Sequence, residues 1–117
     1  MTLIVNDEES LDTVSQTLKL LGDKTRLTIM KLLDEQECCV CELVGIFNTS
    51  QPAVSQHLRK LKDAGFLREN RRGQWIFYSV NRESGQYELL QSLIARLPSQ
   101  LYRIEELEKK GLRISCG

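Results

Sequence analysis

The chain has 117 residues, of which 41% are hydrophobic and 27% are charged, and its sixteen basic and sixteen acidic residues cancel to a net charge of zero. This length suits one domain with its own hydrophobic core, and no signal-peptide pattern or long apolar run points to a secreted or membrane-spanning protein. We therefore expect a cytoplasmic protein whose four cysteines are reduced and free for metal or redox chemistry.

The charges are unevenly distributed along the chain. Residues 51–82 contain seven Lys or Arg and two acids, whereas residues 1–23 contain five acids and one base, and residues 34–42 contain four acids and no base. A basic stretch in a neutral protein is typical of nucleic-acid binding. The middle of the chain is therefore predicted to face nucleic acid, with the acidic segments turned away.

The N-terminal part of the chain predicts two helices. Residues 1–9 have no periodic pattern and are expected to form a loose arm. In residues 10–22 apolar side chains recur at spacings of three and four, and Gly22 ends the predicted helix. Asp23 or Thr25 can cap the next helix. The apolar positions of the two helices are Leu11, Val14, Leu18 and Leu21, then Leu27, Met30 and Leu33.

Residues 40–64 predict a helix-turn-helix. After the polar break at residues 48–50, Ser50 can cap a helix whose first turn tolerates Pro52. Val54, Leu58 and Leu61 then form one buried face. The opposite face is expected to read base edges and phosphates through Gln51, Ser55, Gln56 and Arg59. Any amphipathic helix pair shows such a stripe, so the prediction also depends on the basic hairpin that follows.

Residues 66–80 change to a strand pattern. Gly65 is a natural residue for ending the preceding helix, and residues 75–80 are rich in aromatic and β-branched side chains. Two extended runs around Arg72-Gly73 predict a β-hairpin, the wing of a winged helix-turn-helix. Its tip is expected to place Arg71, Arg72 and Gln74 along a DNA groove.

Residues 84–110 return to a helical pattern that Pro98 is expected to kink or divide. The apolar stripe of this segment exceeds what a three-helix core with one hairpin can cover. Together with residues 10–22 it is therefore predicted to form a homodimer interface, which would supply the second DNA-reading helix. Residues 111–117 form a short tail that contains Cys116. The stripe consists of Tyr87, Leu90, Ile94, Leu97, Leu101 and Ile104.

This order of elements resembles the ArsR/SmtB family of metal-responsive repressors. Between about Leu18 and Leu97 the resemblance is carried by the motifs LLGDKTRLTIMKLL, ECCVCEL, NTSQPAVSQHLRKLKDAGFL and RRGQWIFYSV. It implies a mostly α-helical winged helix-turn-helix homodimer that leaves double-stranded operator DNA when a metal or metalloid binds. For His57 we favour a packed or phosphate-contacting role over a metal-ligand role. The DNA-reading positions implied by the resemblance are Ser50, Gln51, Ser55, Gln56, His57 and Arg59.

Cys38, Cys39 and Cys41 place three thiols within four residues. Thiolates are soft ligands, so without a nearby His or Asp they select soft ions. Three thiols suit As(III) or Sb(III), whereas cadmium, lead and zinc more often recruit four ligands. The resemblance points to the arsenic branch, in which Cys-Val-Cys is followed by Asp-Leu-Cys. Here Val44 stands at the third cysteine position, and Cys38 is the obvious replacement.

No regular backbone gathers these three thiols. In an α-helix Cys39 and Cys41 are about 200° apart around the axis. In a strand they share one side, but Cys38 then points to the other. Binding is therefore predicted to distort the first turn of the helix that braces the DNA-reading helix, which couples the ion to DNA affinity.

Several other functions remain as alternatives. Cys116 could serve as a fourth ligand, although we favour an unligated thiol there. A thiol redox sensor or a cadmium or lead sensor of the same fold is the second candidate. The last helix lacks His and the N-terminal arm lacks Cys, which argues against the family's zinc-type interfacial site and its four-thiolate cadmium/lead site. One histidine, no glycine-rich phosphate loop and no Ser/His/Asp set argue against an enzyme. The first hypothesis is a repressor of metalloid resistance genes.

Overall fold

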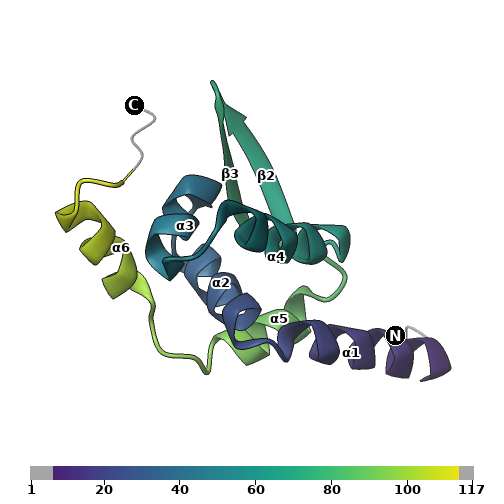
Figure 1. The fold of residues 1–117 in the computed structure, drawn as a ribbon. Helices are drawn as coiled ribbons and strands as arrows, with labels where there is room; N and C mark the ends of the chain where they lie inside the picture. Colours follow the sequence, from purple (N-terminus) through teal and green to yellow (C-terminus); the bar gives the residue numbers. More distant parts are fainter. Residues whose placement is uncertain (1–6, 114–117) are drawn as a thin grey trace.

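The computed structural model describes residues 7–113. Along this part of the chain the elements follow in the order α1 (Asp7–Leu21), α2 (Lys24–Glu35), β1 (Cys38–Cys39), α3 (Val40–Phe47), α4 (Gln51–Asp63), β2 (Leu67–Arg72), β3 (Trp75–Val80), α5 (Tyr87–Ile94) and α6 (Leu101–Lys109) (Figure 1). The expected loose arm is wrong for residues 7–9, which begin α1. Residues 1–6 lie outside the described residues.

The hydrophobic core is formed mainly by α2, α4 and α5. The predicted inward face of α4 is confirmed, since Val54, Leu58 and Leu61 are all buried. In α2, Met30 and Leu33 are buried as predicted, and Leu27 packs against the core. Burial of these apolar side chains is the main favourable contribution to folding.

The turn between α3 and α4 is set by local backbone chemistry. Asn48 takes the left-handed conformation (φ 50°), which asparagine tolerates better than most residues. Ser50 then caps α4 as predicted, with its Oγ accepting from the Ala53 N–H at 3.3 Å. Gly65 (φ 84°) reverses the chain after α4, and the Phe66 N–H donates to the Leu61 carbonyl at 3.0 Å.

The predicted hairpin is part of a three-stranded antiparallel sheet with the strand order β1-β3-β2. β2 and β3 pair from Leu67 with Val80 to Arg72 with Trp75, and their tip projects from the helices (Figure 1). The additional strand is the cysteine pair itself, because Cys38 pairs with Tyr78 and Cys39 with Phe77. A two-residue strand has no periodicity, so the sequence did not predict it.

The segment that contains Pro98 forms two helices, α5 and α6, and residues 95–100 separate them. Leu90, Ile94 and Ile104 are buried within the single chain, so they belong to the core and not to a surplus apolar face. α6 lies beside α3, on the side away from α1 (Figure 1).

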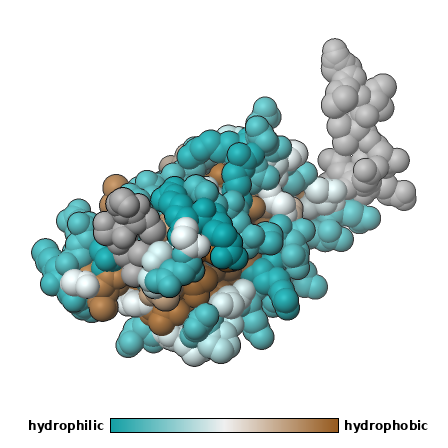
Figure 2. Space-filling view, turned by 90° about the horizontal axis from the view of Figure 1, so that it is seen from above, coloured by the Kyte–Doolittle hydropathy of each residue, from teal (hydrophilic) through white to brown (hydrophobic). Residues whose placement is uncertain are grey.

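The helix α1 leaves the body of the molecule and carries exposed apolar side chains (Figure 1). Leu11 is 70% exposed and Leu18 is 49% exposed, whereas Leu21 is buried. Seen from the wing side, the surface is mainly hydrophilic, with apolar side chains visible between the hydrophilic ones (Figure 2). None of the helices within residues 7–113 combines the length and the apolar content that a membrane crossing needs.

The turn after α4 gives a prediction for stability. Gly65→Ala should destabilise the protein by about 1–2 kcal/mol, because an L-residue is strained in the left-handed conformation. Gly85 provides the control, since its φ lies outside the left-handed region and a Cβ added there would meet no atom within 4 Å. Urea unfolding of both variants measures the difference, and equal destabilisation by Gly65→Ala and Gly85→Ala would contradict it.

Candidate DNA-binding face and thiol cluster

The predicted DNA-reading side chains lie on the solvent side of α4. Gln51, Gln56 and Arg59 are exposed and Ser55 is half-buried, opposite the buried stripe. An open groove of about 590 Å³ separates this helix from the wing. Its lining residues are Ser55, Gln56, Leu58, Arg59, Lys62, Asp63, Glu69 and Tyr78. The basic side chains of the groove, Arg59 and Lys62, come from α4, and the wing adds the polar side chains of Glu69 and Tyr78.

Four of the seven basic residues between positions 51 and 82 form ion pairs within the chain. These pairs are Lys62–Glu69 (3.0 Å), Arg68–Glu83 (2.7 Å), Arg82–Asp34 (3.4 Å) and Arg72–Glu37. Arg59, Lys60 and Arg71 make no ion pair with the residues that the structure describes. Since an anion such as phosphate must compete with an existing partner at a paired base, these three are the most available cations of the stretch.

Arg72, predicted to contact DNA, is held against the cysteine segment. Its guanidinium pairs with the carboxylate of Glu37, which directly precedes Cys38, and lies 4.8 Å from the ring centroid of Phe77. The ion pair and the cation–π contact both hold the side chain back against β3 and the segment before β1, although Arg72 itself belongs to the last residue pair before the hairpin turn. Arg71 and Gln74 are exposed at the tip.

Glu69 joins the wing to α4. Its carboxylate accepts a hydrogen bond from the Tyr78 hydroxyl at 3.0 Å and lies 3.0 Å from Lys62 Nζ. The Lys62 ammonium, followed by the Tyr78 hydroxyl, lowers the pKa of Glu69. Burial, with the adjacent carboxylate, raises the pKa of Tyr78 to about 12. At neutral pH Tyr78 therefore stays protonated and donates across the two strands of the wing, while the Lys62–Glu69 pair joins the wing to α4.

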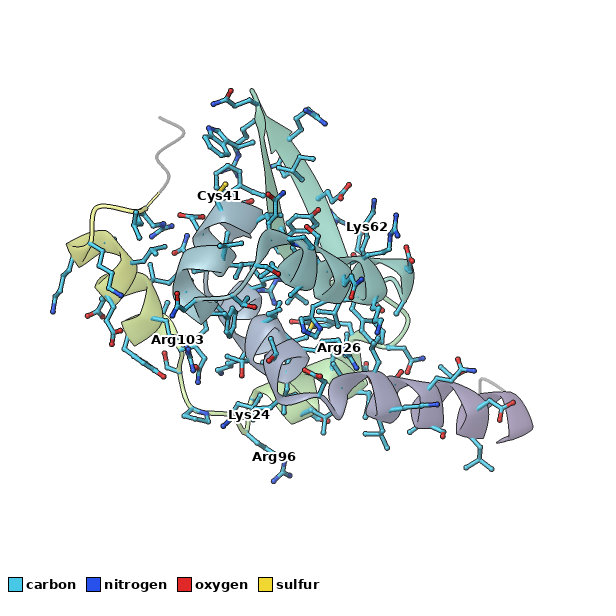
Figure 3. All side chains as sticks on the ribbon, in the orientation of Figure 1. Lys24, Arg26, Cys41, Lys62, Arg96 and Arg103 are labelled. Carbon is cyan, nitrogen blue, oxygen red and sulfur yellow. The ribbon has the colours of Figure 1, made fainter. Side chains whose placement is uncertain are left out.

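His57 faces the interior and not the groove. Its Nδ1 lies 3.3 Å from Arg26 Nη1 at the start of α2, and Arg26 Nε donates to the Leu20 carbonyl at 2.6 Å (Figure 3). Burial lowers the pKa of His57, and the positive charges of Arg26 and Lys60 act in the same direction against the opposing effect of Asp23. The half-buried imidazole thus connects α4 with the junction of α1 and α2.

Cys38 and Cys39 are buried at the junction of the sheet and α3. Cys38 belongs to the hydrophobic core, and its Sγ donates to the Gln36 carbonyl at 3.6 Å. Cys39 is the N-cap residue of α3 and has an extended backbone (φ −95°, ψ 170°). Burial raises the pKa of Cys38 to about 12 and that of Cys39 to about 11, and the charge of Glu42 adds to both effects.

Cys41 is exposed in the first turn of α3, close to the base of the wing (Figure 3). Because Cys38 and Cys39 are neighbours in a strand, their side chains point to opposite sides of the sheet. Within residues 7–113 no group of three Cys, His, Asp or Glu side chains is arranged to hold a metal ion. Three-thiol binding would therefore need a change in β1 or in the first turn of α3. Cys116 lies outside the described residues.

Glu42 and Arg113 form a charged contact that the sequence did not predict. Glu42 is completely buried, its Oε1 accepts from the Cys39 N–H at 3.0 Å, and its Oε2 lies 2.6 Å from Arg113 Nε. The three-residue spacing from Cys39 to Glu42 is that of a capping box, with cysteine in place of serine. That spacing could have predicted the role of Glu42, whereas no local pattern predicts Arg113.

Comparisons with known proteins agree with this arrangement. The family model described as "Bacterial regulatory protein, arsR family" matches residues 23–69. The arsenic resistance transcriptional regulator ArsR2 of Pseudomonas putida is 42% identical over 110 residues, which is 88% of this chain and 96% of that protein. ArsR1 of the same organism is 43% identical over 70 residues, which is 59% of this chain and 55% of that protein. The chain therefore spans about half of that relative's length.

A solved structure shows the same fold. The homodimeric winged helix-turn-helix DNA-binding domain of Mb0332 from Mycobacterium bovis matches 97% of this chain and 94% of that chain, with a TM-score of 0.63 and 22% identity. At this identity the likeness concerns the fold. It confirms the predicted winged helix-turn-helix.

The position of His57, the only histidine, predicts a pH dependence of stability. Because the folded pKa lies below the ordinary value of 6.5, the unfolded chain binds the proton more readily. The contribution of neutral His57 to the free energy of unfolding should therefore be complete above pH 6.5 and decrease as the pH is lowered below that value. Thermal unfolding between about pH 7 and about pH 5 should show this slope, and His57→Gln should flatten it. An unchanged slope in His57→Gln would contradict this role.

Proposed function

The chain belongs to the ArsR family of DNA-binding transcriptional repressors and is not an enzyme, and on this basis we propose that it represses metalloid resistance genes until As(III) or Sb(III) binds its cysteine cluster. The observation that carries the proposal is the position of the cysteines. Cys38 and Cys39 pair with the wing strand β3, and Cys39 caps α3 of the helix-turn-helix. One short segment thus contacts both parts of the DNA-binding face.

For operator recognition we propose that α4 enters the major groove. Gln51 and Gln56 would read base edges through their amides, while Ser50, Ser55 and Arg59 would contact bases or phosphates. Arg71 and Gln74 at the exposed tip would follow the DNA backbone. The intramolecular contacts of His57 and Arg72 favour supporting roles for these two residues. Such a face would act on double-stranded DNA in the cytoplasm.

The proposed repressor acts as a homodimer. The exposed apolar residues Leu11 and Leu18 on the projecting helix α1 support an interface through this helix. A two-fold dimer would present two α4 helices to successive turns of an operator with inverted repeats. The solved Mycobacterium bovis relative is described as homodimeric.

The donor set favours a trivalent metalloid. Arsenous acid can condense with three thiols by exchanging its three hydroxyl groups for sulfur and releasing three water molecules, so neither an oxidant nor a fourth ligand is needed. Cys38, Cys39 and Cys41 supply three thiols within one short segment. Cadmium or lead binding and thiol oxidation are the alternatives, and each requires a further partner such as Cys116.

The resting geometry provides a physical route from inducer to DNA. To bring Cys38 and Cys39 to one ion, the segment has to give up its pairing with Phe77 and Tyr78 or the first turn of α3. Either change disturbs the wing or the helix that packs behind α4. A ligand that binds the changed state better will therefore lower DNA affinity by the same coupling free energy.

The ion pairs predict which arginines neutralise phosphate. Arg59→Gln and Arg71→Gln should each weaken operator binding and lower the slope of log affinity against log salt by about 0.9 per protomer. Arg72→Gln should leave this slope near the parent value, because Glu37 already neutralises Arg72. Fluorescence anisotropy at several salt concentrations measures the slopes. An equal loss of slope in Arg71→Gln and Arg72→Gln would show that Arg72 also binds phosphate.

The cysteine proposal is tested by single substitutions. Cys38→Ser, Cys39→Ser and Cys41→Ser should each bind the operator without inducer but resist release by arsenite, since each removes one of three ligands. Cys116→Ser should respond nearly as the parent does. The measurement is release of a labelled operator during titration with arsenite, and parallel titrations with cadmium, zinc and peroxide test the alternatives.

Two outcomes would change the assignment. A normal response in Cys38→Ser together with a lost response in Cys116→Ser would move the third ligand to the tail. A normal response in all four variants would refute a cysteine-based sensor.

A further inference from the structure

We propose that Arg113 is a positioning residue that holds the cysteine segment in its resting, DNA-binding geometry through the buried carboxylate of Glu42. This inference rests on the proposed function, since it concerns the regulation of the same site. The residues between the end of α6 and Arg113 would then help to set the inducer concentration that releases the protein from DNA.

Glu42 connects the two segments through its two oxygens. Oε1 accepts the Cys39 N–H at 3.0 Å, and Oε2 lies 2.6 Å from Arg113 Nε. The Cys39 N–H precedes the first turn of α3, where helix N–H groups have no partner within the helix. Glu42 therefore fixes the backbone of Cys39, a proposed ligand residue. Arg113 compensates the negative charge of the buried Glu42 carboxylate.

Because Glu42 is buried, its negative charge has to be compensated by neighbouring groups. The Glu42 side chain is 0% exposed and that of Arg113 is 26% exposed. A buried carboxylate without a charged partner is strongly unfavourable, so its orientation depends on its partner. Loss of Arg113 should thus weaken the hydrogen bond between the Glu42 carboxylate and the Cys39 N–H.

The approach of α6 to α3 brings Arg113 to this position. A Cβ at Gly45 of α3 would lie 2.8 Å from Leu107 Cδ1, closer than carbon atoms pack, so the glycine allows α6 to contact α3. At the end of α6, Gly111 (φ 72°) reverses the chain, and the Leu112 N–H donates to the Leu107 carbonyl at 3.1 Å. This turn directs Arg113 back to α3.

The arrangement has a defined thermodynamic consequence. If inducer binding requires the first turn of α3 to change, it also disturbs the contact between Cys39, Glu42 and Arg113. That contact then opposes inducer binding and favours the resting state. Removing it should make the inducer effective at lower concentration, while the uninduced protein still binds DNA.

The test compares the full-length parent with Arg113→Gln. Hydrogen exchange, measured without metalloid, should be at least about fivefold faster for the amides of residues 38–42 in the variant, and half-release of a labelled operator should need about fivefold less arsenite. Arg96→Gln is the matched control, because Arg96 is an exposed arginine that points away from the body of the molecule (Figure 3). It should exchange and respond as the parent does.

A second variant protects the test against misfolding. Arg113→Gln removes one charged partner of the buried Glu42, whereas Glu42→Gln combined with Arg113→Gln removes both charges of this pair and keeps a carbonyl acceptor for the Cys39 N–H. The double variant should fold, and α6 should exchange faster than in the parent. Its half-release concentration should lie between those of the parent and Arg113→Gln.

The outcomes separate this inference from the proposed function. Parent-like exchange of residues 38–42 in Arg113→Gln, or a higher half-release concentration, would overturn the role of Arg113. If arsenite fails to release the parent, the proposed inducer is refuted, and the exchange rates still decide whether Arg113 positions the cysteine segment.

Discussion

A carboxylate that is fully removed from water must have partners for both its oxygens, and this constraint organises the region around Glu42. One oxygen holds the N-terminal end of α3 through Cys39, and the other holds the segment after α6 through Arg113. The start of α6 is held separately, because the Gln100 N–H donates to Glu35 Oε1 at 2.7 Å and Arg103 lies 5.5 Å from the ring centroid of Phe47. The same carboxylate therefore sets the start of the helix-turn-helix and the docking of the C-terminal helix.

The strand β1 extends this organisation to the wing. Cys38 and Cys39 form the third strand of the sheet, and Cys39 is also the N-cap residue of α3. The position of the sheet is therefore fixed relative to the helix-turn-helix. The Arg72–Glu37 ion pair adds a second link between the wing and the residues before β1. The Lys62–Glu69 ion pair links the wing to α4. A change at the cysteines consequently has two short routes to the DNA-binding face.

Local patterns in the sequence predicted most of the fold. The buried stripe of α4, its Ser50 cap and the Gly65 turn all depend on residues within a few positions of one another. The sequence could not predict contacts between distant segments: Glu42 and Arg113 are 71 residues apart, and Arg72 and Glu37 are 35 apart. For the same reason, counting charges between residues 51 and 82 overstated the free positive charge.

The ion pairs within residues 51–82 bear on how the proposed repressor would distribute itself over a genome. Attraction to arbitrary DNA comes almost entirely from cations that displace counterions, and here most cations of the basic stretch already neutralise the chain's own acids. Under the proposed function, chromosomal DNA outside the operator is then expected to compete weakly for the protein. If the chain acts as proposed, a molecule that leaves its operator is correspondingly expected to be little retained elsewhere on the chromosome.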